Sequence, residues 1–267
     1  MNMSNQHSKY ALITGASSGI GLELATVAAG KSNNLIVISR DEKRLNQLKD
    51  ELEAAHGIRV IVFACDLSQP DAVSKIEALL SAEKIVPDIL INNAGFGLFG
   101  AFAHASGQRE TEMIQVNIMA LTQLTKTVYP QMIQRGSGKI LNVASMAGFM
   151  PGPLMAVYYA TKAYVLSFSQ ALANEAKGTG ITVTTLCPGA TQSNFEKTAA
   201  LESSMLFKRF GKLPAAAEVA AFGFRKMEQG ATLAVHGWSN RAMLFSLRLF
   251  PRKTVTAVVR YIQRTKR

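Results

Sequence analysis

The chain of 267 residues has few of the features that mark secreted, membrane-spanning or metal-binding proteins. It has only two cysteines, Cys65 and Cys187, at the ends of predicted strands and without metal-ligand spacing. We therefore expect a reduced, buried pair in a reducing compartment, and no bound metal. No apolar run approaches the ~20 residues that a membrane span needs. The polar segment 1–9 lacks the apolar core of a secretory signal, which favours a cytoplasmic location.

Acidic residues are missing from the C-terminal end of the chain. No Asp or Glu follows Glu228, whereas the last 39 residues hold eight Lys or Arg. The net charge of +11 belongs mainly to this tail, because residues 1–228 carry 21 basic and 18 acidic side chains. The nearly neutral main body argues against a nucleic-acid-binding face, so we expect no nucleic-acid partner.

Strand and helix patterns alternate along the chain. Helical segments such as Glu42–Ala55, with Leu45, Leu48 and Leu52 on one face, separate short apolar runs. The predicted strands are Tyr10–Thr14, Leu35–Ser39, Val60–Ala64, Ile89–Asn92, Ile140–Val143, Val183–Leu186 and Thr232–Val235. This alternation predicts a single α/β domain over residues 1–237, a Rossmann-type doubly wound parallel sheet of about seven strands. Its ligand is expected at the carboxyl ends of the strands.

A glycine-rich loop, TGASSGIG at 14–21, directly follows the first predicted strand. Gly15, Gly19 and Gly21 permit a tight turn and let the backbone approach a pyrophosphate at the next helix N-terminus. The spacing Gly-x-x-x-Gly-x-Gly differs from the general dinucleotide fingerprint, and turns are often glycine-rich without any ligand. Its place between a strand and a helix nevertheless predicts a dinucleotide site.

The second predicted strand ends in Ser39-Arg40, where NAD-preferring sites usually carry an Asp or Glu. A serine and a guanidinium would bind a ribose 2′-phosphate, which a carboxylate would repel. We therefore favour NADP(H) over NAD(H). The alternative is that Arg40 only begins a basic, solvated helix face with Lys43 and Arg44.

Three residues suggest acid–base chemistry. Tyr158 and Lys162 lie one helical turn apart, and Ser145 precedes the tyrosine by thirteen residues. A cation beside a phenol, whose pKa is ordinarily ~10, should lower that pKa toward the catalytic range. Ser145 would hydrogen-bond the substrate oxygen. Tyr-x-x-x-Lys alone occurs by chance on many helices, and the neighbouring Tyr159 is expected to line the pocket or pack.

Taken together, these residues resemble the short-chain dehydrogenase/reductase family, especially its carbonyl-reductase-type members. The resemblance covers residues 9 to 237 and follows the family's order of motifs. The motifs are TGASSGIG at 14–21, Asp66 after the third strand, NNAG at 92–95, Asn117, Ser145, Tyr158-x-x-x-Lys162 and Pro188-Gly189.

The resemblance implies roles for residues that the loop alone does not identify. Asp66 and Leu67 match positions that contact the adenine, the turn at 92–95 borders the adenosine ribose, and the segment at 188–191 holds the nicotinamide carboxamide. The expected cofactor residues are Gly15, Ser17, Ser18, Gly19, Ile20, Gly21, Ser39, Arg40, Asp66, Leu67, Asn92, Asn93, Ala94, Gly95, Tyr158, Lys162, Pro188, Gly189 and Thr191.

The resemblance also implies a catalytic set of Asn117, Ser145, Tyr158 and Lys162. Lys162 would bind the nicotinamide ribose and acidify Tyr158, and Asn117 would anchor a water-linked proton relay. The expected activity is NADP(H)-dependent reduction of a hydrophobic ketone or aldehyde, or oxidation of the corresponding alcohol, with Tyr158 as general acid/base. The alternatives are an NAD-linked alcohol dehydrogenase, a non-catalytic NADP-binding sensor and a membrane-recruited protein.

The segment Met146–Ala156 follows the catalytic serine and is expected to wall the substrate pocket, although core packing would explain some of its side chains. Phe96, Leu98 and Phe99 would complete an apolar mouth. The resemblance also implies a mobile substrate lid at 193–213, after Pro188-Gly189. The expected pocket residues are Ser145, Phe149, Met150, Leu154 and Met155.

Residues 238–267 form an extension beyond the family pattern. Two short basic amphipathic helices, broken at Pro251, are predicted there. They would pack over the active-site entrance or core, contact another subunit, or attach peripherally to an anionic membrane surface. The long helices Gln108–Gln134 and Ala156–Lys177 match those through which family members form dimers or tetramers, so we expect a homodimer or homotetramer.

Overall fold

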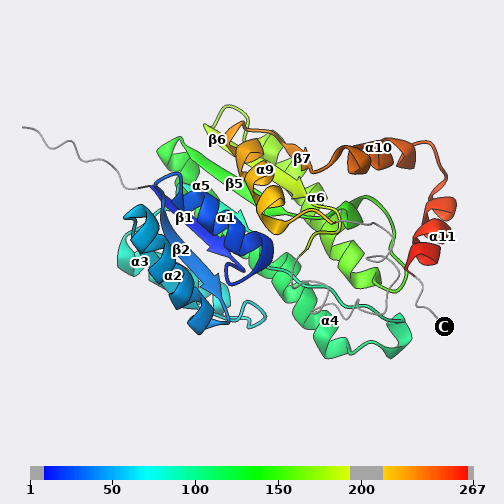
Figure 1. Ribbon diagram of the computed structural model, residues 1–267, viewed down its shortest axis with the longest axis horizontal. Helices are drawn as coiled ribbons and strands as arrows, with labels where there is room; N and C mark the ends of the chain where they lie inside the picture. Colours follow the sequence, from blue (N-terminus) through cyan, green and yellow to red (C-terminus); the bar gives the residue numbers. More distant parts are fainter. Residues whose placement is uncertain (1–8, 193–212, 264–267) are drawn as a thin grey trace, which may run out of the picture.

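The computed structural model describes residues 9–192 and 213–263. Seven strands form one parallel sheet in the order β3-β2-β1-β4-β5-β6-β7 (Figure 1). The strands are β1 (Tyr10–Thr14), β2 (Asn34–Ser39), β3 (Val60–Ala64), β4 (Ile89–Asn92), β5 (Gly138–Val143), β6 (Ile181–Cys187) and β7 (Leu233–Val235). All seven predicted strands are present and the predicted fold class is confirmed.

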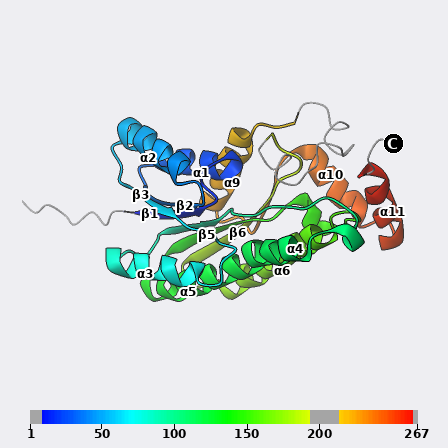
Figure 2. The same cartoon turned by 90° about the horizontal axis from the view of Figure 1, so that it is seen from below.

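Helices cover both faces of the sheet (Figure 2). One face carries α1 (Gly19–Ala29), α2 (Glu42–His56) and α9 (Ala216–Glu228). The other carries α3 (Ala72–Glu83), α4 (Gly107–Ile114), the π-helical turn η2 (Gln115–Ala120), α5 (Leu121–Arg135) and α6 (Ala156–Glu175). Short 3-10 turns lie at η1 (Phe102–His104) and η3 (Met146–Phe149).

The strands are mostly apolar because both faces of the sheet are covered. Along β2, Leu35 and Val37 belong to the core under α1 and α2, whereas Ile36 and Ile38 belong to the core on the other face. A local signal fixes the start of α2. The Asp41 side chain accepts the Arg44 N–H at 3.1 Å and caps the start of α2.

The strand order reverses at β1, which pairs with β2 on one side and β4 on the other. The loops that follow β1 and β4 therefore leave toward opposite faces of the sheet. Such a switch point opens a crevice at the carboxyl ends of the strands, where doubly wound proteins bind their ligands.

The long helix predicted at Gln108–Gln134 is interrupted. It consists of α4, the wider turn η2 and α5, so the prediction of one uninterrupted helix is corrected. The interruption lies at Asn117, whose buried side chain contacts the loop after β4. π-helical turns inside α-helices often mark functional positions.

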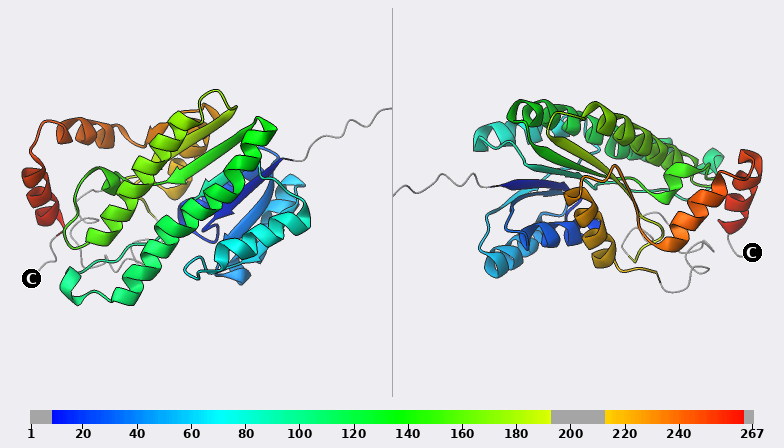
Figure 3. Two further views of the ribbon diagram at one scale, coloured as in Figure 1. Left: turned by 180° about the vertical axis from the view of Figure 1, so that it is seen from behind. Right: turned by 90° about the horizontal axis from the view of Figure 1, so that it is seen from above.

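The C-terminal extension folds as predicted into two helices separated at Pro251, α10 (Trp238–Leu247) and α11 (Arg252–Ile262). They lie beyond the carboxyl ends of the strands (Figure 3). The expected lid at 193–213 lies outside the described residues except for Leu213. Within residues 9–192 and 213–263, no helix has the length and apolar character to cross a membrane.

Apolar side chains are exposed along the outer helical layer. Ile114, Met119, Ile133 and Tyr164, on the segment from α4 to α6, are each more than a third exposed. This is the layer in which the subunit contact was expected, and the homodimer or homotetramer stays a prediction.

Candidate active site

A cavity of about 1120 Å³ lies at the carboxyl ends of the strands. It extends from the glycine loop after β1, past Ser145 and Tyr158, to the tail helix α11. The cavity is large enough for both a dinucleotide and a substrate. In the described part of the chain, no group of three or more side chains is suited to hold a metal ion.

The glycine loop lines one end of this cavity with all six of its predicted residues, Gly15, Ser17, Ser18, Gly19, Ile20 and Gly21. Gly15 has φ +68°, which a side chain would strain. A Cβ atom on Gly21 would collide with the Gly15 carbonyl, so only glycine allows α1 to pack this closely on the loop. The first turn of α1 has no acidic residue, and the N–H groups at a helix start are suited to bind an anion.

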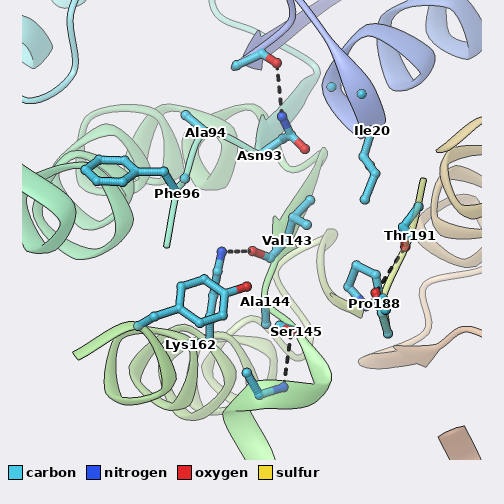
Figure 4. Close-up of a pocket in the computed structure, with 18 of the residues that line it drawn as sticks. Ile20, Asn93, Ala94, Phe96, Val143, Ala144, Ser145, Lys162, Pro188 and Thr191 are labelled. Atoms are coloured by element: carbon cyan, nitrogen blue, oxygen red, sulfur yellow. Dashed lines mark hydrogen bonds between the residues drawn. The ribbon is translucent and has the colours of Figure 1, made fainter. Parts of the chain in front are cut away.

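Asn93 holds this loop in place. Its Nδ2 donates to the carbonyls of Thr14 at 3.0 Å and Gly15 at 3.2 Å. Figure 4 shows Asn93 and Ala94 between the loop and the catalytic region. Asn93, Ala94 and Gly95 line the cavity, whereas Asn92 is buried beneath it and donates to Asn142 at 2.9 Å. Asn92 thus joins β4 to β5 rather than facing the cavity.

Charged side chains that follow β2 line the cavity. Ser39 and Arg40 both line the cavity as predicted, and so do Asp41 and Arg44, which were not among the predicted cofactor residues. Asp41 lies 3.5 Å from the Arg44 guanidinium and caps the same helix. Asp66 and Leu67, after β3, line the adjacent wall.

Ser145, Tyr158 and Lys162 come together as predicted. Ser145 follows β5, and its Oγ accepts the Ala147 N–H at 3.1 Å. The Ser145 hydroxyl is hydrogen-bonded to the Tyr158 phenol. The Lys162 Nζ donates to the Val143 carbonyl at 2.9 Å (Figure 4) and lies 6.0 Å from the centre of the Tyr158 ring.

The predicted lowering of the Tyr158 pKa is wrong. Burial raises the pKa of Tyr158 well above its usual range, and the hydrogen bond with Ser145 offsets only part of that effect. Burial also lowers the pKa of Lys162 to about 8. The Lys162 ammonium donates to a backbone carbonyl rather than to the phenol, so it does not compensate for the burial of Tyr158.

Asn117 lies behind this group rather than on the described cavity wall. Its Oδ1 accepts the Phe96 N–H at 3.1 Å, and its Nδ2 donates to the Thr161 hydroxyl at 3.0 Å. A Cβ atom on Gly95 would lie 3.0 Å from Asn117 Oδ1 and 3.3 Å from Lys162 Nζ. Asn117 therefore bridges the loop after β4 to the helix that carries Lys162.

Pro188, Gly189 and Thr191 line the cavity, and Figure 4 shows Pro188 and Thr191 beside the side chain of Ile20. The Pro188 carbonyl accepts the Met146 N–H at 2.9 Å, which ties this segment to the end of β5. A Cβ atom on Gly189 would lie 2.7 Å from Asn240 Nδ2 in α10. Asn240 lines the cavity itself and was not predicted, because its position follows from the packing of the extension.

The expected substrate wall is partly corrected. Met150 and Met155 line the cavity, but Phe149 and Leu154 are absent from its described lining. Phe149 packs against a buried core cluster that includes Leu121. The Leu154 carbonyl instead accepts the Gly100 N–H at 2.8 Å. Phe96 lines the cavity, as the expected apolar mouth requires, whereas Leu98 and Phe99 pack beside Met155.

The tail helix completes the wall. Val259, Ile262 and Gln263 line the cavity, so of the three interpretations of the extension the structure shows packing over the active-site region. Gln263 is fully buried, and its Nε2 donates to the Tyr159 hydroxyl at 2.7 Å. Tyr159 lines the cavity as expected, and burial raises its pKa to about 12.

Comparison with known proteins supports the family resemblance. The family model of the short chain dehydrogenases matches residues 9–203. A very-long-chain 3-oxoacyl-CoA reductase of Danio rerio is 34% identical over 235 residues, 86% of this chain and 72% of that protein. A short chain dehydrogenase of Pseudocercospora fijiensis is 36% identical over 187 residues, and the match spans 69% of this chain but only 60% of that relative.

A solved structure supports the same family assignment. A short-chain dehydrogenase from Sphingobium yanoikuyae, in complex with NADPH, superposes with a TM-score of 0.80 at 31% identity, covering 90% of this chain and 94% of the other. The matching family model, the parallel sheet and the gathered Ser145, Tyr158 and Lys162 lead to one conclusion. The chain belongs to the short-chain dehydrogenase/reductase family, whose oxidoreductases act on CH–OH and C=O groups.

Proposed function

We propose that the protein is an NADP(H)-dependent reductase of hydrophobic ketones or aldehydes, 3-oxoacyl chains among them, which also oxidises the corresponding alcohols. The observation that carries the proposal is the buried Tyr158 phenol. It is hydrogen-bonded to Ser145 in a cavity that joins the glycine loop to an apolar wall.

The cavity residues fit a phosphorylated dinucleotide. The free N–H groups at the start of α1 suit a pyrophosphate, and Asn93 fixes the loop that presents them. Arg40 and Arg44 bring two guanidinium groups to the end of β2, where a 2′-phosphate would be bound by charge-assisted hydrogen bonds. The NADPH complex of the Sphingobium yanoikuyae relative supports the same preference.

Bound NADPH supplies a hydride to the carbonyl carbon of the substrate. Tyr158 donates its phenolic proton to the carbonyl oxygen. Because burial raises the pKa of Tyr158, the phenol is protonated before this transfer. The Ser145 hydroxyl donates a hydrogen bond to the same oxygen and stabilises the negative charge that develops there.

Lys162 keeps its hydrogen bond to the Val143 carbonyl, and from 6.0 Å its positive charge would stabilise the phenolate that forms once Tyr158 has given up its proton. Its pKa of about 8 leaves most of the side chain charged at neutral pH, within reach of the tyrosine ring. Asn117 acts by positioning, because it ties the Phe96 backbone to Thr161, next to Lys162.

The substrate end of the cavity favours an apolar chain or ring. Met150 and Met155 line the same cavity as Ser145 and Tyr158. The tail contributes Val259 and Ile262 to the cavity wall. Methionines adapt to apolar ligands of different shapes. The Danio rerio relative, a very-long-chain 3-oxoacyl-CoA reductase, supports 3-oxoacyl substrates as one such class.

A chain-length series tests this proposal. NADPH oxidation is followed with 3-oxoacyl thioesters and methyl ketones of increasing length, beside small polar ketones. We expect kcat/KM to rise as apolar carbon is added, since each buried methylene contributes about 0.8 kcal/mol. Faster turnover of the small polar ketones would contradict the proposed substrate class.

A further inference from the structure

The exposed apolar side chains of the protein are concentrated on its tail. Twelve large apolar residues are exposed in the described part of the chain, and six of them lie between residues 238 and 261. Trp238 is 82% exposed, and Phe245 and Leu249 are each about two-thirds exposed. Soluble proteins rarely leave such a group of aromatic and aliphatic side chains in water without a partner.

The same segment carries charge of one sign. Residues 238–263 contain Arg241, Arg248, Arg252, Lys253 and Arg260 and no acidic residue, and three further basic residues follow in the sequence. A surface that is both apolar and uniformly basic matches an anionic lipid surface, where each Lys or Arg contributes about fivefold to binding. It does not suit a second copy of itself, because the like charges would repel.

The tail has a second side, which faces the active site. Val255 and Val259 of α11 are buried, and Val259 also lines the cavity, whereas Val258 is half exposed. Ser239 and Asn240 of α10 line the cavity too, next to the exposed Trp238. The apolar basic surface therefore borders the cavity that is expected to receive a hydrophobic substrate.

We propose that α10 and α11 form a docking surface for an anionic lipid bilayer. The apolar side chains of Trp238, Phe245, Leu249 and Phe250 would enter the interface, and the exposed Arg248, Arg252 and Lys253 would contact lipid phosphates. This placement brings the substrate cavity to the membrane surface. Only the delivery of a lipophilic substrate rests on the proposed function, since docking itself needs no turnover.

The chain offers its own probe of this interaction. Trp238 is the only tryptophan, so the intrinsic tryptophan fluorescence of the full-length protein reports on this surface alone. Vesicles of phosphatidylglycerol and phosphatidylcholine at low salt should shift its emission to the blue, and lipids brominated on the acyl chains should quench it. Co-sedimentation with the same vesicles measures the affinity.

Two variants separate charge from apolar contact. In the first, Arg248→Glu with Lys253→Glu should weaken co-sedimentation at least tenfold. The control Lys9→Glu with Lys177→Glu makes the same change of net charge at exposed positions near the amino ends of the strands, and should bind as the wild type does. In the second, Leu249→Ser with Phe250→Ser should weaken binding severalfold and reduce the quenching by brominated lipid.

The proposal is overturned if the wild type does not co-sediment at low salt, if pure phosphatidylcholine binds it equally well, or if the charge-reversal variant binds as tightly as its control. A concentration-dependent dimer that is lost in both variants, without vesicle binding, would assign the surface to a second copy instead. NADPH-dependent turnover of a water-soluble ketone is measured in parallel. If the wild type does not turn over the ketone, the proposed function is contradicted, whereas the result of the vesicle-binding experiment is unaffected.

Discussion

The side-chain amide of Gln263 donates a hydrogen bond of 2.7 Å to the hydroxyl of Tyr159, across 104 residues of sequence. This contact joins the end of the tail helix to the catalytic helix, one residue from Tyr158. Because both side chains line the cavity, the extension is part of the cavity wall and not an independent appendage.

Removing the Tyr159 hydroxyl should destabilise the protein. Tyr159→Phe leaves the amide of Gln263 buried without its partner, which typically costs about 1–3 kcal/mol. Adding Gln263→Met should recover most of this loss, since an apolar side chain of similar size replaces the unpaired amide. Urea unfolding of the two single variants and the double variant measures the coupling. A double variant as unstable as Tyr159→Phe alone would contradict this role for the contact.

Arg40 should determine the choice of cofactor. Arg40→Ala removes a charge-assisted contact to the 2′-phosphate, so we expect the KM for NADPH to rise about 10- to 100-fold while the KM for NADH changes little. Lys43→Ala is the matched control, because Lys43 is exposed and absent from the described cavity lining. Equal effects on both cofactors would show that Arg40 does not contact the 2′-phosphate.

Lys162 should make stability rise with pH. The folded protein releases the Lys162 proton near pH 8, whereas the unfolded chain keeps it until about 10.5, so the unfolded state binds more protons in this interval. Between pH 8 and 9 the free energy of unfolding should rise by about 1 kcal/mol relative to Lys162→Met. The raised pKa values of Cys187 and Tyr158 act in the opposite direction at higher pH, and largely cancel in this comparison. A constant or falling difference would contradict the burial of a charged amine.

The sequence alone predicted those parts of the structure that depend on a short local pattern of residues. The apolar runs predicted all seven strands, and the order of glycine loop, Ser145, Tyr158 and Lys162 predicted which side chains meet. The free, buried Cys65 and Cys187 also match the prediction.

Predictions failed where a residue's environment is set by distant segments. The pKa of Tyr158 depends on burial by the whole cavity wall, which the spacing to Lys162 does not report. Arg44 and Asn240 line the cavity although they were not among the predicted site residues, and Asn240 belongs to the extension beyond the family pattern. Phe149 follows the catalytic serine in sequence but packs into the core.

The most direct test compares Tyr158→Phe with Tyr159→Phe in NADPH-dependent reduction of a hydrophobic ketone. Loss of a positioned general acid typically costs about 100- to 10,000-fold in rate, so Tyr158→Phe should lose kcat by that factor while its Kd for NADPH stays close to that of the wild type. Tyr159→Phe should retain kcat within about tenfold. Turnover by Tyr158→Phe near the wild-type rate, or an equal loss in both variants, would contradict the assignment of Tyr158 as the proton donor.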